Sequence, residues 1–488
     1  MTEKEQHHFI RSLGLWDATM LVAGSMIGSG IFIVSADMSR NVGSSGWMMF
    51  LWILSGAITV MAALCYGELA GMMPKAGGQF VYIQRAFGNF TSFLYGWTVF
   101  AVIQTGVIAA VAVAFAKYTA VFLPWFSPDN KLLFVGSFSL SAAQLLAIFL
   151  IVVLTYINSR GITNGKLIQT GFTTAKLLAL LLLIVAGLII GWSNNTLSSN
   201  LTHAWDAVQL TKQGDSWIAK NISGFALLLA LGTAIIGSLF SSDAWNNVTF
   251  IAGEIKDPQR NIPRSLLMGT GIVTLLYCLA NISYLSLLPL HGSATATDVI
   301  GQGIQFAGNG TDRVGTAAAS MIFGDVSVYI MAALIMVSTF GCNNGIILSG
   351  ARVYYAMSKE GLFFKKAGEL NKNDVPGFAL WVQAGWASVL CLSGTYGDLL
   401  EYCTFASLLF YIVTIAGIFI LRKKEPDTER PYKTLAYPMM PALYILIAAT
   451  ICAILLYTKP QSTFSGLAIV LIGAPLYLLV KRDTLSKS

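Results

Sequence analysis

The run Gly24-Ser25-Met26-Ile27-Gly28-Ser29-Gly30 lies in the middle of the first long apolar segment of this chain. Each glycine disfavours a helix by about 1 kcal/mol relative to alanine. A main-chain group without a partner in hydrocarbon costs several kcal/mol more, so an interrupted helix at membrane depth must be buried in protein or line a polar cavity. The run therefore predicts a ligand site of the kind that secondary transporters build from the ends of broken helices.

The composition of the rest of the chain is that of a membrane protein. Of its 488 residues, 55% are hydrophobic and 11% are charged, whereas soluble domains carry about 25% charged residues. About twelve apolar segments approach or exceed the ~20 residues that cross a bilayer. The sequence therefore predicts an all-α integral membrane protein with about twelve transmembrane helices. The segments are residues 16–38, 46–72, 92–122, 138–157, 167–191, 226–250, 265–289, 329–357, 377–393, 398–421, 437–457 and 462–480.

The distribution of basic residues predicts the orientation of these segments. The net charge is +7, from 30 Lys and Arg against 23 Asp and Glu. With both termini in the cytoplasm, about 22 of the basic residues fall on the cytoplasmic side, which is the positive-inside pattern. We therefore expect a multi-pass protein of the plasma membrane (the cell inner membrane) with both termini cytoplasmic. Its basic residues set topology in the lipid bilayer, and we expect no nucleic-acid partner.

Cysteine and histidine positions argue against metal or redox chemistry. The six cysteines all fall in apolar segments without metal-ligand spacing, and the four histidines lie outside those segments. The chain also shows no catalytic triad and no nucleotide-binding loop. We therefore expect no metal site, no cofactor and no enzymatic activity.

The sixth apolar segment is interrupted much as the first is. Its middle, residues 237–246, reads GSLFSSDAWN, and Ser, Asp and Asn favour caps and turns over helix interiors. Helices one and six are an odd number of spans apart, so they run in opposite directions, as expected for an inverted repeat with its site at the repeat interface. The sequence predicts a single membrane transport domain over 1–488. Its parts are a first repeat at 16–192, a second at 226–421 and a terminal helix pair at 437–480.

Four stretches resemble one known family. They are residues 24–32 (GSMIGSGIF), 74–82 (PKAGGQFVY), 245–263 (WNNVTFIAGEIKDPQRNIP) and 349–361, which contains SGAR and SKEG. Together they resemble the amino acid–polyamine–organocation superfamily, and within it a prokaryotic type of the L-type amino acid transporter branch. The resemblance implies twelve helices, a LeuT-like core of five plus five inverted helices with discontinuous helices 1 and 6, and transport of amino acids.

The two interruptions suit an amino acid zwitterion. Amides near Ser29 and Gly30 would bind the carboxylate, because a helix N-terminus offers free N–H groups and partial positive charge. The carbonyls of Met26 and Ile27, with those near Phe240 and Ser241, would accept from the ammonium. The alternative for the first run is a small-residue packing face. The candidate substrate-binding residues are Ser25, Met26, Ile27, Gly28, Ser29, Gly30, Phe240, Ser241, Ser242, Asp243 and Asn344.

Three of these candidates have competing roles. The resemblance implies that Phe240 is an aromatic gate over the substrate, and the alternative is a packing phenylalanine. Asp243 would contact the ammonium group or cap the second half of helix six. Asn344 would line the pocket, as the resemblance implies, or form an interhelical hydrogen bond.

Lys176 is the one basic residue placed deep inside a predicted span, about nine residues or ~13 Å past its start. That depth is large for snorkelling to the membrane edge. In sodium-independent relatives, the resemblance implies, this lysine replaces a sodium ion and bridges helices one and eight; alternatively it exchanges a proton. Gln104-Thr105 replaces the Arg-Pro usual in heteromeric relatives, and residues 123–137 contain no cysteine. We therefore expect no covalent heavy-chain subunit.

These observations predict a secondary active transporter of amino acids that works by alternating access. We expect sodium-independent exchange of neutral L-amino acids, because the two breaks contain one acidic residue and no basic one. The alternative within the class is a proton-coupled symporter. The alternative outside it is a transport-inactive receptor or scaffold.

Overall fold

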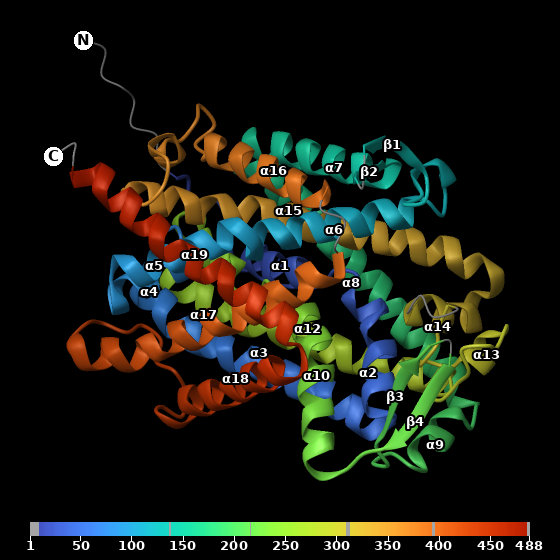
Figure 1. The fold of residues 1–488 in the computed structure, drawn as a ribbon. Helices are drawn as coiled ribbons and strands as arrows, with labels where there is room; N and C mark the ends of the chain where they lie inside the picture. The colour runs from blue at the N-terminus through green and yellow to red at the C-terminus, as the bar shows by residue number, and fades with distance from the viewer. Residues whose placement is uncertain (1–8, 136–137, 215, 309–312, 393–395, 486–488) are drawn as a thin grey trace.

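The computed structural model describes residues 9–135, 138–214, 216–308, 313–392 and 396–485. Within this part of the chain, ten helices are long and apolar enough to cross a membrane, and they lie side by side in one bundle (Figure 1). The protein is therefore a mostly helical integral membrane protein. The ten are α3 (Ser45–Met72), α5 joined to α6 (Asn89–Thr98 and Gln104–Thr119), α7 (Ala142–Ser159), α8 (Ile162–Trp192), α10 (Gly224–Ser241), α12 (Pro258–Leu287), α15 (Ser327–Lys359), α17 (Tyr396–Lys424), α18 (Met439–Thr458) and α19 (Pro460–Leu485).

Two of the predicted spans have a different form. The first is divided into α1 (Leu15–Met26), the short 3₁₀ turn η1 (Gly30–Phe32) and α2 (Val34–Val42). The ninth is α16 (Gly377–Leu392), an apolar helix of 16 residues. The interruption predicted at residues 24–30 is therefore present, and it lies between the end of α1 and the start of η1.

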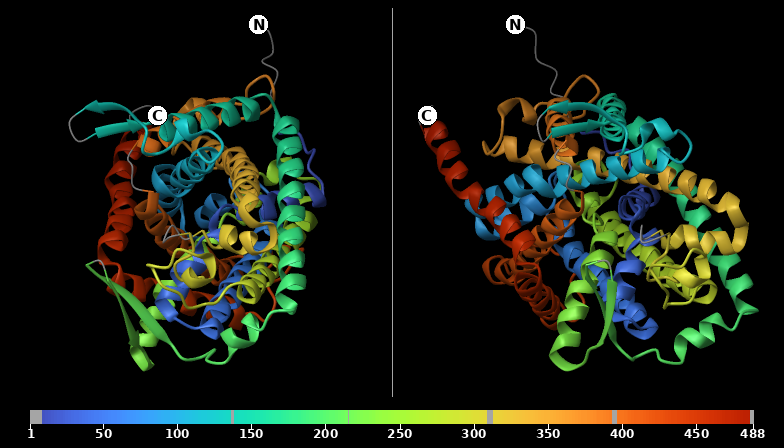
Figure 2. Two further views of the ribbon diagram at one scale, coloured as in Figure 1. Left: turned by 90° about the vertical axis from the view of Figure 1, so that its right-hand side faces the viewer. Right: turned by 45° about the vertical axis from the view of Figure 1, so that its right-hand side comes forward.

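The bundle has two distinct ends. The start of α1 and the end of α19 lie at one end, which we call the terminal face (Figure 1). At the opposite end, which we call the hairpin face, lie the short helices and two antiparallel hairpins (Figures 1 and 2). These elements are β1 (Lys131–Val135), β2 (Phe138–Ser141), α9 (Thr196–Leu201), β3 (Val208–Gln213), β4 (Ser216–Asn221), α13 (Val299–Gln302) and α14 (Val314–Phe323).

The hairpins correct the all-α expectation. Residues 192–225, which lie between the fifth and sixth predicted spans, contain α9 and the β3–β4 hairpin. Val208, Gln209, Leu210 and Thr211 alternate apolar and polar side chains, a short pattern that favours a strand. Gly214 adopts φ +60°, a conformation that glycine reaches at no steric cost and that a tight hairpin turn requires.

Ion pairs join distant segments near the terminal face. The Nε of Arg352 on α15 lies 2.7 Å from Oε1 of Glu254, in the turn that follows helix six, and both side chains are buried. Glu68, near the end of α3, accepts from the Arg422 guanidinium at 2.7 Å and from the main-chain amide of Thr434 at 2.7 Å. Glu68 thus ties α3 to the end of α17 and to the segment that follows it.

Candidate functional site

The interruption of helix one leaves main-chain groups available. The amide of Ile27 still bonds to Ala23, and Ile27 then turns to an extended conformation with φ −77° and ψ 98°. Helical bonding resumes where the amide of Phe32 reaches the carbonyl of Ser29. Among the described residues, the amides of Gly28 and Gly30 have no main-chain partner. Free amides at the start of a helical segment favour an anion.

The glycines of this run do two different things. A Cβ on Gly24 would lie 2.1 Å from Thr173 Oγ1 on α8, so Gly24 allows α1 to pack closely against α8. A Cβ on Gly28 would meet only Cys342 Sγ, at 3.7 Å, and Gly28 lines a cavity. The packing role that was the alternative for this run therefore applies to Gly24, while Gly28 faces open space.

Helix six is interrupted beside helix one. The helix α10 ends at Ser241, and Ala244 adopts φ +64° before the short α11 (Asn247–Phe250) begins. A left-handed alanine costs about 1 kcal/mol, so the surrounding packing holds this turn. A Cβ on Gly30 would lie 2.1 Å from Ser241 Oγ. The two interruptions therefore touch each other.

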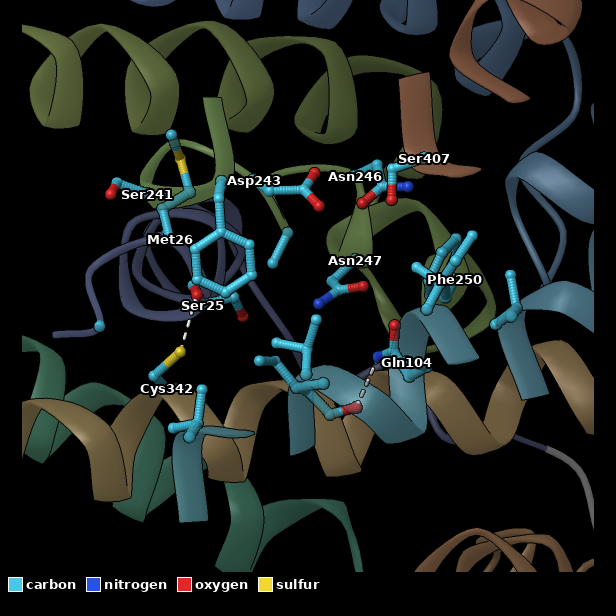
Figure 3. A pocket seen from close by; sticks show the side chains of 18 of the residues that line it. Ser25, Met26, Gln104, Ser241, Asp243, Asn246, Asn247, Phe250, Cys342 and Ser407 are labelled. Atoms are coloured by element: carbon cyan, nitrogen blue, oxygen red, sulfur yellow. Dashed lines mark hydrogen bonds between the residues drawn. The ribbon is translucent and has the colours of Figure 1, made fainter. Parts of the chain in front are cut away.

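A cavity lies between the two interruptions (Figure 3). It holds about 760 Å³ of space outside protein atoms, part of it open to solvent. Its other walls come from the segment running from α5 to α6, from α15 and from α17. Most of the predicted substrate-binding residues line it: Ser25, Met26, Gly28, Ser29, Gly30, Phe240, Ser241 and Asp243.

The other three predicted residues lie outside this cavity. The Ile27 carbonyl, expected to face the ammonium, instead accepts from Lys176 Nζ at 2.6 Å and Ser338 Oγ at 3.0 Å. Ser242 lines a smaller cavity between α3, α10, α17 and α18. Asn344 makes interhelical hydrogen bonds, accepting from Asn158 Nδ2 at 2.9 Å and donating to the Gly165 carbonyl at 3.1 Å. None of the three lines the cavity, and the contacts of Asn344 are those of its alternative role, an interhelical hydrogen bond.

Lys176 lies in the middle of the bundle with 1% of its surface exposed. Its ammonium donates to the carbonyls of Gly24 at 2.5 Å and Ile27 at 2.6 Å, both at the end of α1. A longer contact of 3.4 Å reaches the carbonyl of Ser338 on α15. Lys176 therefore joins the interrupted first helix to α15, which is the eighth predicted span.

Asp243 and Phe240 face the cavity from the helix-six side. Asp243 is half-buried, and its Oδ1 accepts from the Tyr411 hydroxyl at 2.5 Å. No side-chain cap is present at the start of α11, whose N-cap residue is Asn246. The carboxylate thus pairs with α17 and does not cap helix six. Phe240 is half-buried and lines the cavity.

Several residues in or behind the cavity wall were missed from the sequence. Tyr277, which lies behind the wall on α12, donates to the carbonyls of Ser241 at 3.0 Å and Met26 at 3.3 Å. Gln104 follows a π-helical turn at Val99–Ile103 and donates to the Ile346 carbonyl at 2.8 Å. Such π turns are frequent at functional sites. The sequence gives little indication of Tyr277 and Gln104, because each reaches the site only when its helix packs against the others.

The segment of the second resembling motif also reaches the cavity. Gln79, in α4 (Gln79–Phe87), accepts from Asn246 Nδ2 at 3.0 Å and donates to Thr414 Oγ1 at 3.0 Å. Gln79 and Asn246 both line the cavity. The motif residues 74–82 and 245–263 could have directed attention to these two side chains, since both lie inside them.

The comparisons with known proteins agree with this geometry. A family model described as "Amino acid permease" matches residues 13–477. The chain is 29% identical over 476 residues to "Large neutral amino acids transporter small subunit 2" of Oryctolagus cuniculus, covering 96% of this chain and 80% of the relative. It is 28% identical over 481 residues to "Serine/threonine exchanger SteT" of Bacillus subtilis, covering 98% of each. The match to "Asc-type amino acid transporter 1" of Mus musculus is 26% over 476 residues, covering 96% of this chain and 81% of the relative. This chain therefore belongs to the amino acid permease family of the amino acid–polyamine–organocation superfamily.

Proposed function

We propose that this protein exchanges neutral L-amino acids across the plasma membrane by alternating access and without sodium. The names of the relatives describe a transporter of large neutral amino acids and a serine/threonine exchanger. Among the described residues that line the cavity, Asp243 is the one charged side chain, and its carboxylate already accepts from Tyr411. A cavity with so little net charge suits a zwitterion without a charged side chain.

The proposed architecture has twelve spans. The interrupted segment α1–α2 and the short α16 would supply the two that the ten long helices lack. We propose that residues 16–192 and 226–421 form two inverted repeats, with 437–480 as a terminal pair. The support is that an interruption occurs in the first helix of each half and that the two interruptions meet. An even number of spans would leave both termini on one side, which we propose is cytoplasmic.

The proposed substrate position follows from the free main-chain groups. The substrate carboxylate would bind the amides between Gly28 and Gly30, since these lack main-chain partners among the described residues. The ammonium would bind the carbonyls of Met26 and Ser241. Each accepts one bond from Tyr277, and a carbonyl oxygen can accept a second. Phe240 would cover the bound substrate as a gate.

The position of Lys176 is the observation that supports transport without sodium. Main-chain carbonyls at the end of a broken helix are the ligands that coordinate sodium in secondary transporters. Here the carbonyls of Gly24 and Ile27 are bound by a lysine ammonium. The fixed positive charge would hold the first helix against α15 without an ion. No chemistry on the substrate and no covalent heavy chain are part of the proposal.

Purified protein in liposomes loaded with a neutral amino acid tests the proposal. Uptake of a radiolabelled neutral amino acid is measured from sodium medium and from medium in which choline replaces sodium. We expect equal rates in the two media, with a panel of external competitors inhibiting most strongly when they are neutral L-amino acids. A several-fold loss in choline would overturn the sodium-independent assignment, and stronger competition by charged amino acids would overturn the substrate class.

A further inference from the structure

One amide in the cavity wall has no protein partner for its donor. Two residues that line the cavity have a buried polar side-chain atom without a partner in the described part of the chain: Ser25, at Oγ, and Asn247, at Nδ2. Ser25 lies near the helix-one interruption, among the groups proposed to hold the substrate main chain. Asn247 offers a carboxamide on the helix-six side of the cavity.

The neighbouring amides are all engaged, which sets Asn247 apart. Asn246 Nδ2 donates to Gln79 at 3.0 Å, and Gln104 Nε2 donates to the Ile346 carbonyl at 2.8 Å. Asn247 is 1% exposed, lies at the start of α11, and projects between Asp243 and Gln104 into the cavity (Figure 3). A buried donor that has no protein partner and lies in a cavity wall is available to a bound ligand.

The surroundings of Asn247 indicate the kind of ligand. The cavity is largely apolar on the side of Gln104, where Val107, Val111 and Ile346 also line it. An N–H donor needs an acceptor, and the nearby Asp243 carboxylate disfavours an acidic one. An uncharged oxygen on the substrate side chain, in a hydroxyl or a carboxamide, meets both conditions.

We propose that Asn247 selects substrates whose side chain carries an uncharged hydrogen-bond acceptor over apolar side chains of the same shape. This inference rests on the proposed function, in which the cavity binds a neutral amino acid. An apolar side chain leaves the Asn247 amide buried and unpaired, whereas a hydroxyl or carboxamide oxygen accepts its hydrogen bond. A site built around such a bond discriminates strongly against the analogue that lacks it.

Threonine and valine provide the test, because they have nearly the same shape and differ in one hydroxyl. Exchange into valine-loaded liposomes is measured for both, and the ratio of kcat/KM is taken. We expect wild type to favour threonine by on the order of tenfold. Asn247→Leu should bring the ratio close to one while valine exchange persists, and Asn247→Ser, which keeps a hydroxyl donor, should retain part of the preference.

Thr155→Val is the matched control. Thr155 Oγ1 is also buried and unpartnered in the described structure, but Thr155 is on α7 and does not line the cavity; its replacement should leave the ratio unchanged. Equal efficiency for threonine and valine in wild type would overturn the inference while leaving neutral exchange intact. A preference that survives in Asn247→Leu would also overturn it. If the wild-type protein exchanged no amino acid at all, the result would instead overturn the proposed function on which this inference rests.

Discussion

At the scale of single residues, Lys176 is a buried cation that main-chain carbonyls hold in place. Its depth was predictable, since a lysine surrounded by apolar residues at 167–191 has little access to the membrane edge. Its partners were not predictable from the residues alone, because they are main-chain carbonyls exposed by the turn at Ile27. Every residue type carries a main-chain carbonyl, so the residue types at Gly24 and Ile27 do not reveal these contacts.

Replacing Lys176 by methionine should lower exchange at least tenfold at every pH between about 5.5 and 8.5. The Gly24 carbonyl would lose its donor, and an unsatisfied buried carbonyl costs about 1–3 kcal/mol, where about 1.4 kcal/mol corresponds to tenfold. The measurement is initial exchange per folded transporter in liposomes.

Lys166→Met is the matched control for this change. Lys166 is on the same helix, but its side chain is 30% exposed and pairs with Asp17 at 2.8 Å. Partly exposed ion pairs contribute about 0–1 kcal/mol, so this variant should exchange at a rate close to wild type. If Lys176→Met exchanged at the wild-type rate, the ammonium would be dispensable for transport. Loss confined to one side of the pH range would indicate that Lys176 titrates during transport.

At the scale of elements, the two interrupted helices were the most predictable part of the site. Gly24–Gly30 and the Ser-Ser-Asp run after Phe240 both contain residues that oppose a continuous helix, and both places are interrupted. Which individual groups would face the cavity was less predictable. The Asn344 side chain contacts Gly165 on α8 and does not line the cavity, because neighbouring positions on a helix are rotated by about 100°. The Ile27 carbonyl is instead bound by Lys176, just past the end of α1.

Alanine substitutions at Gly28 and Gly30 should distinguish an effect on substrate binding in the cavity from an effect on the contact between helices one and six. Gly28→Ala places a methyl group in the cavity with only an ordinary 3.7 Å contact to Cys342 Sγ. The melting temperature in detergent should therefore stay near that of wild type, while the KM for substrate rises on the order of tenfold. Gly30→Ala puts its Cβ 2.8 Å from Ser241 Cβ and 3.2 Å from Ser241 Cα. This overpacking should destabilise the protein by about 1–3 kcal/mol.

Gly271→Ala on α12 provides the reference for both changes. Its Cβ would have no heavy atom within 4 Å, so neither stability nor KM should move. Equal KM values for Gly28→Ala and wild type would show that Gly28 does not border the substrate. An unchanged melting temperature for Gly30→Ala would show that helix one can move away from Ser241 without cost.

At the scale of the whole molecule, hydrophobicity predicted the helical bundle but not the hairpins and short helices of the hairpin face. Long apolar runs define the spans because hydrocarbon admits only helices with satisfied main-chain groups. The β3–β4 hairpin and α9 lie outside the long apolar runs, and their short, mostly polar sequences resemble loops. The cavity draws residues from α1, α10, α15 and α17, and only the assembled bundle brings them together.

The central claim is exchange without a coupled ion, and uptake into loaded and empty liposomes tests it most directly. Radiolabelled threonine is supplied outside in choline medium, to liposomes that contain either unlabelled neutral amino acid or buffer alone. We predict rapid uptake into the loaded liposomes and little uptake into the empty ones, because the unloaded carrier reorients slowly. Uptake into empty liposomes that rises with an imposed inward proton gradient would contradict exchange and establish proton-coupled symport.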